Sequence, residues 1–277
     1  MIDLHLHTTA SDGRSTPREL VEEAVSAGLT VMAVTDHDTT ASVDEVRALA
    51  RERGVACVPG IEITAVEDGR DVHVLGYFLD PADARLGEFL AAQRQTRLDR
   101  VQAIAARLAE LGMPIDLRAS LAEVREQPGR SIGRPQVARA MAHAGHVSST
   151  REAFDRWLGR DLPAFVPRSG SSPEEVIAII QRAGGLTSLA HPGRTSLDAR
   201  IPALRDAGLD AIEVYHSDHD RAAISRYHQL ATDVGLLMTG GSDFHGDPMH
   251  GVMVGAAAVP DEAWQRFRAA QHRHVAA

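Results

Sequence analysis

The segment 3–8, with the sequence DLHLHT, places two histidines one residue apart near the start of the chain. On a β-strand, side chains two positions apart point to the same face, so His5 and His7 can reach one common point. Imidazole nitrogens are good ligands of transition metals such as Zn and Fe. One strand could therefore supply two ligands to a single metal ion; the alternative is a pair of half-exposed strand histidines.

Residues of metal-binding type recur along the chain, in or directly after short apolar runs. They are His37, Glu62, His73, His191, His216, Asp243 and His245. Asp243 and His245 repeat the same-face spacing of the first pair. His73 lies between valines, where a buried structural histidine is the alternative, and Asp12 before Gly13 could be a turn residue. Pro192 favours an extended backbone at His191.

The elements that must position these residues alternate between strand-like and helix-like segments. Strands are expected at 2–7, 31–34, 55–58 with a continuation through 61–64, 72–78, 186–190, 211–215 and 236–238. Helices are expected at 17–27, 42–53, 173–182, 201–207 and 222–232. This pattern of about seven β/α units is typical of a parallel sheet or barrel. In such folds, active residues gather at the carboxyl ends of the strands.

Residues 93–171 interrupt the alternation and are predicted to form an inserted helical subdomain, with the barrel built from 1–92 and 172–277. Leu98, Val101, Ile104 and Leu108 have helical spacing. The insert carries 13 arginines against 8 acidic residues, although the whole chain has a net charge of −9. A basic insert over an acidic barrel suggests a lid for an anionic substrate; the alternative is a solvated helical surface.

The composition narrows the class of protein. A length of 277 residues with 44% hydrophobic content suits one α/β barrel or two modest domains. All 29 basic residues are arginine, so any anion site must use guanidinium groups, and lysine chemistry is excluded. No apolar run approaches the ~18 residues of a transmembrane helix. Because the candidate ligands begin at His5, no cleaved signal peptide is expected, and we predict a cytoplasmic protein.

Five motifs together resemble those of the polymerase and histidinol phosphatase (PHP) family of metal-dependent phosphoesterases. They are DLHLHT at 3–8, TDH at 35–37, GIE at 60–62, AHP at 190–192 and GSDFH at 241–245. The segments SIGRP at 131–135, PAFVP at 163–167 and EVYH at 213–216 resemble one branch, whose members are similar to nucleoside 3′,5′-bisphosphate phosphatases and 5′→3′ exonucleases of short RNA. The resemblance implies an α/β fold: a distorted seven-stranded β/α barrel of the PHP type with an inserted helical subdomain.

The resemblance also implies a site for two or three divalent metal ions. The first ion would be held by His5, His7, Glu62 and Asp243; Glu62 would bridge to a second, completed by His73 and His191; the third would use Asp12, His37 and His245. Many family members carry histidine where this chain has Asp12. Because a carboxylate is the harder ligand, we expect Mn²⁺, with Zn or Fe as alternatives.

Such a site predicts phosphate-ester hydrolysis. A bound divalent metal lowers the pKa of water from 15.7 to about 7, so hydroxide can attack phosphorus at neutral pH. The first hypothesis is removal of the 3′-phosphate of nucleoside 3′,5′-bisphosphates, such as adenosine 3′,5′-bisphosphate to AMP, with 5′→3′ trimming of short 5′-phosphorylated RNA. The alternatives are a histidinol-phosphate-type or other small-molecule phosphomonoesterase and a non-catalytic metal-binding module.

Three residues are predicted to contact the substrate. Arg134, between Gly133 and Pro135, would clamp a phosphate, and Arg160 in the same insert is a further candidate. His216 would contact phosphate or act as general acid toward the leaving oxygen. Surface side chains with no such role are the alternative. The expected partner is a small nucleotide, and neither a membrane nor long duplex nucleic acid is expected; the oligomeric state is left open.

Overall fold

Seven strands form one sheet in the order β1-β2-β3-β4-β5-β6-β7 in the computed structural model, which describes residues 1–127, 129–195, 197–246 and 251–274. The strands are β1 (Ile2–Leu6), β2 (Val31–Val34), β3 (Ala56–Glu67), β4 (Arg70–Tyr77), β5 (Leu186–Leu189), β6 (Ala211–His216) and β7 (Leu237–Gly241). The sheet curls into a nearly closed barrel, because the Asp243 N–H donates to the His5 carbonyl at 2.9 Å and Leu6 pairs with Phe244. The predicted seven-stranded barrel is confirmed.

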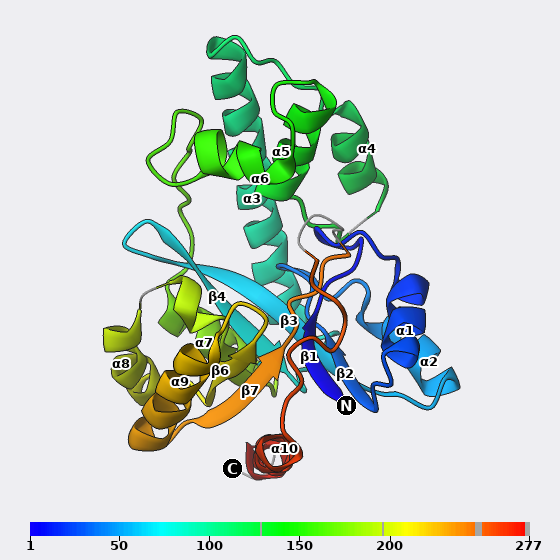
Figure 1. Ribbon diagram of the computed structural model, residues 1–277, viewed down its shortest axis with the longest axis vertical. Helices are drawn as coiled ribbons and strands as arrows, with labels where there is room; N and C mark the ends of the chain where they lie inside the picture. The colour runs from blue at the N-terminus through cyan, green and yellow to red at the C-terminus, as the bar shows by residue number, and fades with distance from the viewer. Residues whose placement is uncertain (128, 196, 247–250, 275–277) are drawn as a thin grey trace.

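Helices pack around the outside of this barrel (Figure 1). They are α1 (Pro17–Ser26), α2 (Val43–Glu52), α7 (Pro173–Arg182), α8 (Ile201–Asp206) and α9 (Arg221–Val234). Helix α1 begins where Thr16 and Glu19 form a capping box, with Pro17 in the first turn, which satisfies backbone N–H groups that have no helical partner. All five lie within a few residues of the ranges that the sequence predicts.

Strand β4 corrects the expectation of uninterrupted β/α units. It runs antiparallel to both β3 and β5, and only a two-residue turn joins it to β3. Asp68 and Gly69 in that turn have φ values of 48° and 69°, which suit a tight hairpin turn. A ligand on β4 therefore reaches the same end of the barrel from the amino-terminal half of its strand.

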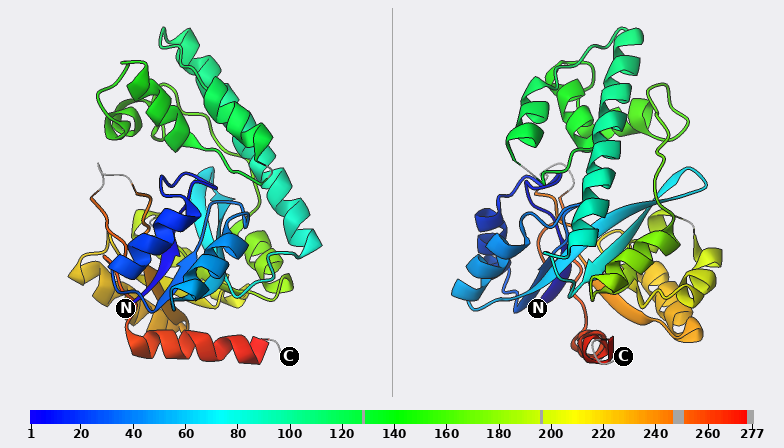
Figure 2. Two further views of the ribbon diagram at one scale, coloured as in Figure 1. Left: turned by 90° about the vertical axis from the view of Figure 1, so that its right-hand side faces the viewer. Right: turned by 180° about the vertical axis from the view of Figure 1, so that it is seen from behind.

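A helix that the sequence reading did not predict closes the opposite end of the barrel. Helix α10 (Asp261–His274) lies across the bottom of the barrel in Figure 2. Its Phe267 packs edge-on against Tyr77 with ring centroids 5.3 Å apart, and Trp264 belongs to the same buried cluster as Ile2 and Leu186. The core thus fills the lower barrel and leaves its upper end for polar side chains.

The inserted segment forms a helical cap above that upper end (Figures 1 and 2). Its elements are α3 (Ala84–Glu110), α4 (Arg118–Glu126), α5 (Arg134–His143), α6 (Thr150–Ala153) and a π-helix (Phe154–Leu158). Helix α3 belongs to both parts: Leu86 and Leu90 pack in the barrel core, and Leu108 packs in the core of the cap. The boundary expected between residues 92 and 93 falls inside this helix, so the division of the chain there stays a prediction.

No helix in the described part of the chain is both long and apolar enough to cross a membrane.

Candidate metal centre

The nine predicted ligands come together at the upper end of the barrel. His5 lies on β1, Glu62 on β3 and His73 on β4, whereas the loops that follow β1, β2, β5 and β7 carry the others. His7, Asp12, His37, His191, Asp243 and His245 are the members that lie on those loops. Eight of the nine, all but His191, belong to overlapping groups in which the ligand atoms lie within 4.8 Å of one another. Side chains from six strands or their loops thus converge as the sequence predicts.

The first group joins His5, His7, Glu62 and Asp243, and all four are buried. The Nε2 atom of each histidine lies 3.3 Å from Glu62 Oε2, and these atoms lie 3.3 and 3.2 Å from Asp243 Oδ1. Two imidazoles and two carboxylates therefore point at one small volume. This is the set of residues expected for the first metal ion.

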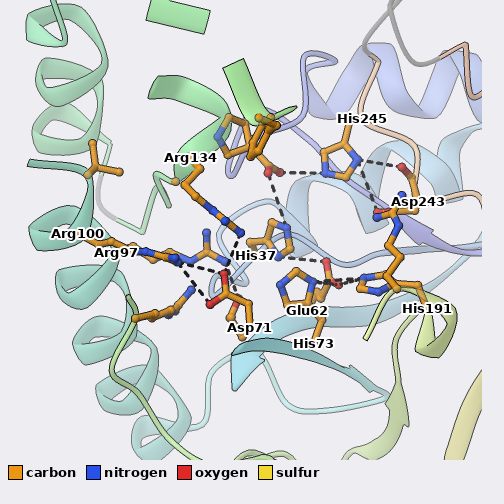
Figure 3. Close-up of a pocket in the computed structure, with 18 residues that line it drawn as sticks. His37, Glu62, Asp71, His73, Arg97, Arg100, Arg134, His191, Asp243 and His245 are labelled. Atoms are coloured by element: carbon orange, nitrogen blue, oxygen red, sulfur yellow. Dashed lines mark hydrogen bonds and ion pairs between the residues drawn. The ribbon is translucent and has the colours of Figure 1, made fainter. Parts of the chain in front are cut away.

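Glu62 connects this group to a second set of imidazoles. Its Oε1 atom lies 2.8 Å from His73 Nδ1 and 3.1 Å from His191 Nε2, so its two oxygens face different groups (Figure 3). His37 also joins here, with Nδ1 3.1 Å from Glu62 Oε2. The sequence prediction placed His37 in the third group alone, whereas the geometry lets it serve either.

Asp12 organises the third group. Its Oδ1 atom lies 3.2 Å from His245 Nε2, and its Oδ2 atom lies 3.7 Å from His37 Nε2. His7 completes the group through Nδ1, which lies 3.9 Å from Asp12 Oδ1. Because His7 presents one ring nitrogen to each group, it can link the first site to the third. Asp12 therefore lies where the family resemblance implies a ligand.

The carboxylates of the cluster are strongly ionised. Burial alone would raise the pKa values of Asp12, Glu62 and Asp243, but the surrounding histidines hold them well below the usual range. Burial lowers the pKa of His37 to about 3 and that of His191 to about 4, so both imidazoles are neutral at pH 7. Although burial alone would lower them, the adjacent carboxylates raise the pKa values of His5, His7 and His245, so these imidazoles must release a proton when they bind a metal ion.

The cluster passes a direct test of fit for metal ions. Among the described residues, several buried atoms that face it have no hydrogen-bond partner: His5 Nε2, both ring nitrogens of His7, His37 Nδ1 and Glu62 Oε2. Buried polar atoms rarely remain unpaired, since each one costs about 1–3 kcal/mol. Divalent cations would satisfy these atoms, and the mixture of imidazole and carboxylate suits Mn, Fe or Zn.

Glu213 at the end of β6 holds two of the ligands from behind. Its Oε1 atom lies 2.9 Å from His5 Nδ1, and its Oε2 atom accepts a hydrogen bond of 2.7 Å from the His191 N–H. His5 Nε2 is therefore the nitrogen left to face the cluster. The second contact also explains why His191 has φ 27° rather than the extended backbone that Pro192 favours.

His216, the predicted general acid, is buried at the end of β6. Its Nδ1 atom accepts a hydrogen bond from the Asp218 N–H at 3.0 Å, and its Nε2 atom lies 3.5 Å from Asp243 Oδ2. It does not line the cavities found among the described residues next to the cluster. This position favours contact with Asp243 over contact with substrate, and the acid role stays a prediction.

A cavity of about 240 Å³ lies between the cluster and the cap, and arginines line its far side. Arg134 donates to Asp71 Oδ2 at 3.0 Å, and Arg100 lies 3.1 Å from the same oxygen. Arg97 and Arg168 bind the buried carboxylate of Asp38. In Figure 3 the labelled arginines lie on one side of Glu62 and His37, and Asp243 and His245 lie on the other. One cavity thus offers metal ligands at one end and guanidinium groups at the other.

The sequence prediction found only part of this arginine-rich wall. Arg134 lines the cavity as predicted, whereas Arg160 lies farther out, beside a neighbouring cavity, with its side chain 47% exposed. The sequence reading missed Asp71, Arg97 and Arg100. Asp71 lies two residues before His73 on the same strand, and that same-face spacing was the available signal.

Comparison with known proteins agrees with this geometry. The PHP domain family matches residues 3–150. The chain is 35% identical over 250 residues to the 5′-3′ exoribonuclease Rnm of Escherichia coli (strain K12), covering 88% of this chain and 84% of that protein. It is 32% identical over 249 residues to the 3′,5′-nucleoside bisphosphate phosphatase of Chromobacterium violaceum, covering 88% and 87%. A crystal structure described as a metal-dependent phosphoesterase of Bifidobacterium adolescentis is similar with a TM-score of 0.86 at 35% identity, over 96% of this chain and 94% of that one.

Proposed function

This chain belongs to the PHP domain family of metal-dependent phosphoesterases, and from that premise we propose that it hydrolyses the 3′-phosphate of nucleoside 3′,5′-bisphosphates. We propose that it also trims short 5′-phosphorylated RNA in the 5′→3′ direction. The names of the two relatives support these activities. The observation that carries the proposal is the single cavity with metal ligands at one end and arginines at the other.

The arginine-rich end distinguishes a bisphosphate from a simple monoester. Arg134 and Arg100 share the Asp71 carboxylate, which fixes their guanidinium groups beside the cavity. A substrate with two phosphates can place one at the metal cluster and the other against these arginines. Binding energy from the second phosphate then positions the first for reaction. A monoester such as histidinol phosphate has no second phosphate and gains nothing from this wall.

The residues of the cluster would hold two or three divalent ions, which we propose to be Mn²⁺ in a trinuclear centre that includes Asp12. Bound there, the ions would neutralise charge on the scissile phosphate and lower the pKa of water. The three buried carboxylates Asp12, Glu62 and Asp243 carry fewer negative charges than the positive charges of even two divalent ions. The loaded site would therefore be positively charged and attract phosphate. We also predict that the protein acts in the cytoplasm on small nucleotides. We expect it to bind neither long duplex nucleic acid nor membranes.

A substrate panel tests this function. The protein is stripped with a chelator, reloaded with Mn²⁺ and given adenosine 3′,5′-bisphosphate, 5′-phosphorylated di- to pentanucleotides and histidinol phosphate. Mass spectrometry should find AMP and inorganic phosphate from the bisphosphate and 5′-mononucleotides from the oligomers. Hydrolysis of histidinol phosphate with the bisphosphate left intact would overturn the proposal.

A variant pair tests the role of the arginines. Arg134→Gln should raise KM for the bisphosphate at least about tenfold, the typical cost of one lost charge-assisted contact, with a much smaller effect on a monoester. Arg118→Gln is the matched control, because its side chain lies in the same cap but is 91% exposed. Equal effects of the two substitutions would remove Arg134 from the phosphate site.

A further inference from the structure

Two more cavities adjoin the central one, and each shares a different set of lining residues with it, although Arg194 lines all three. The first, which we call the Thr150 pocket, has a volume of about 240 Å³ and shares Asp12, Asp243 and His245 with the metal cluster. The second, the arginine pocket, has a volume of about 320 Å³ and shares Asp71, Arg100 and Arg134 with the central cavity. Figure 3 shows Arg100 and Arg134 on one side of Glu62 and Asp243 and His245 on the other.

The arginine pocket suits an anion. Five arginines line it, at positions 70, 100, 134, 160 and 194, and Asp71 is its single acidic residue among the described ones. Arg100 and Arg134 point into the central cavity as well, so an anion here would be continuous with a group bound at the metal cluster. A terminal phosphate fits this chemistry because guanidinium binds phosphate oxygens in pairs.

The Thr150 pocket has a different chemistry. Two arginines line it against three aspartates, so it carries no excess of positive charge. Phe154, Pro135 and Val252 give it apolar surface. The hydroxyls of Thr150 and Ser217 line the same pocket and have no hydrogen-bond partner among the described residues. Apolar walls with a few unpaired hydroxyls suit an aromatic base and a ribose better than a phosphate.

The π-helix places Phe154 at the junction of the pockets. Phe154 is the first residue of that helix, and its ring lines both the central cavity and the Thr150 pocket. The Arg134 guanidinium carbon lies 5.8 Å from the ring centroid, so the ring is held beside the phosphate-binding wall. Single π-helical turns occur often at functional sites. An aromatic ring at this point can contact a base next to the scissile phosphate.

We propose that the Thr150 pocket binds the second nucleoside of a 5′-phosphorylated oligonucleotide, while the arginine pocket binds its 5′-phosphate. The substrate then runs from the arginine pocket, across the metal cluster, into the Thr150 pocket. Water adds to phosphorus, the bond to the 3′-oxygen of the first nucleoside breaks, and that oxygen takes up a proton. The products are a 5′-mononucleotide and a 5′-phosphorylated remainder. This inference rests on the proposed function and adds the site that lets a diester replace a bisphosphate.

Two diesters that differ only in the second nucleoside test the inference. One is the dinucleotide of two adenosines joined by a 3′→5′ phosphodiester and carrying a 5′-phosphate. The other is adenosine 3′,5′-bisphosphate with a methyl ester on its 3′-phosphate. The wild-type kcat/KM should favour the dinucleotide about tenfold, since contact of one base with an aromatic ring has an effect of that size. In Thr150→Phe, which fills the pocket, the ratio of the two kcat/KM values should fall to near one. Thr232→Phe is the matched control, because Thr232 is exposed on α9, and it should keep the wild-type ratio.

The outcomes separate this inference from the proposed function. If the wild-type protein hydrolyses neither diester nor the bisphosphate, the proposed function fails. If it hydrolyses the bisphosphate but shows no preference between the diesters, the inference alone fails. Should Thr150→Phe lose its fold by circular dichroism, Val252→Phe fills the pocket from another of its walls and gives the same test. The inference is overturned if a folded variant with a filled pocket keeps the wild-type ratio of the two kcat/KM values.

Discussion

Asp38 is the residue whose replacement by asparagine should destabilise this protein most clearly. Its carboxylate is fully buried on the loop after β2 and binds the guanidinium groups of Arg97 and Arg168. The Thr64 N–H donates to its other oxygen at 2.9 Å. The side chains of Arg97 and Arg168 are only 9% and 2% exposed, so solvent does little to screen them. Asparagine keeps the shape but leaves two buried cations without a charged partner.

The expected loss follows from that burial. Removing one partner of a buried ion pair costs about 3–5 kcal/mol, because the remaining charge stays desolvated. For a chain of this size, such a loss lowers Tm by roughly 6–20 °C. Burial would raise the pKa of Asp38, but Arg97 and Arg168 hold it at about 2. A carboxylate with a lowered pKa stabilises the folded state above its unfolded pKa, so about 2 kcal/mol should be lost as the pH falls from 4 toward 2.

Urea denaturation at pH 7, followed by circular dichroism, measures the free energy of unfolding of Asp38→Asn. The matched control is Asp44→Asn on α2, where the side chain is 86% exposed and lies 3.6 Å from Arg47. An exposed pair of this kind contributes less than about 1 kcal/mol. The reasoning is refuted if Asp38→Asn unfolds within 1 kcal/mol (roughly a factor of five in the folding equilibrium) of the wild-type protein. A smaller loss of stability between pH 4 and pH 2 in Asp38→Asn than in the wild-type protein is the second expected result, because Asp12, Glu62 and Asp243 keep their own acid dependence.

Three further outcomes are expected. Chelation of divalent metals should abolish hydrolysis and Mn²⁺ should restore it, as a phosphate-release assay would show; activity that survives exhaustive chelation contradicts the metal mechanism. Glu213→Gln should weaken metal binding about 10–100-fold in a calorimetric titration, because Glu213 orients His5 and the loop at His191; an unchanged affinity would remove that role. Phe267→Ala should cost about 3–5 kcal/mol in thermal or urea unfolding, since it opens a cavity beneath Tyr77 where α10 seals the barrel; a loss below about 1 kcal/mol would mean that α10 is dispensable.

The sequence could predict which side chains converge at the upper end of the barrel, because the signals for them are local. The spacing of His5 and His7 on a strand forces both rings to one face, and Asp243 and His245 repeat that spacing. The alternation of strands and helices then brings distant loops to one end of a barrel. His73 lies on β4, which runs in the opposite direction to its neighbours. Because His73 is in the amino-terminal half of that strand, it still lies at the end of the barrel where the parallel strands have their carboxyl ends.

The sequence predicts the strand at 72–78 but not its antiparallel direction, although a signal for that direction is present. Asp68-Gly69 between two apolar runs is a strong hairpin signal, and it outweighs the expectation of a helix between neighbouring strands. The arginine-rich wall lacked such a signal. Arg97 and Arg100 lie among many arginines on the long helix α3, and only the way that helix crosses the barrel decides which of them face Asp38 and Asp71.

The continuity of α3 has a mechanical consequence. Its 27 residues form a rod about 40 Å long, with one end anchored in the barrel and the other in the cap. The cap is also tied to the loop after β1, since the Ser131 N–H donates to the Ala10 carbonyl at 2.8 Å. A swinging motion of the cap would have to bend a continuous helix and break this bond. We therefore expect the cap to stay fixed over the barrel. Substrates would be selected by whether they fit through an opening of constant width, and turnover would need no closing step.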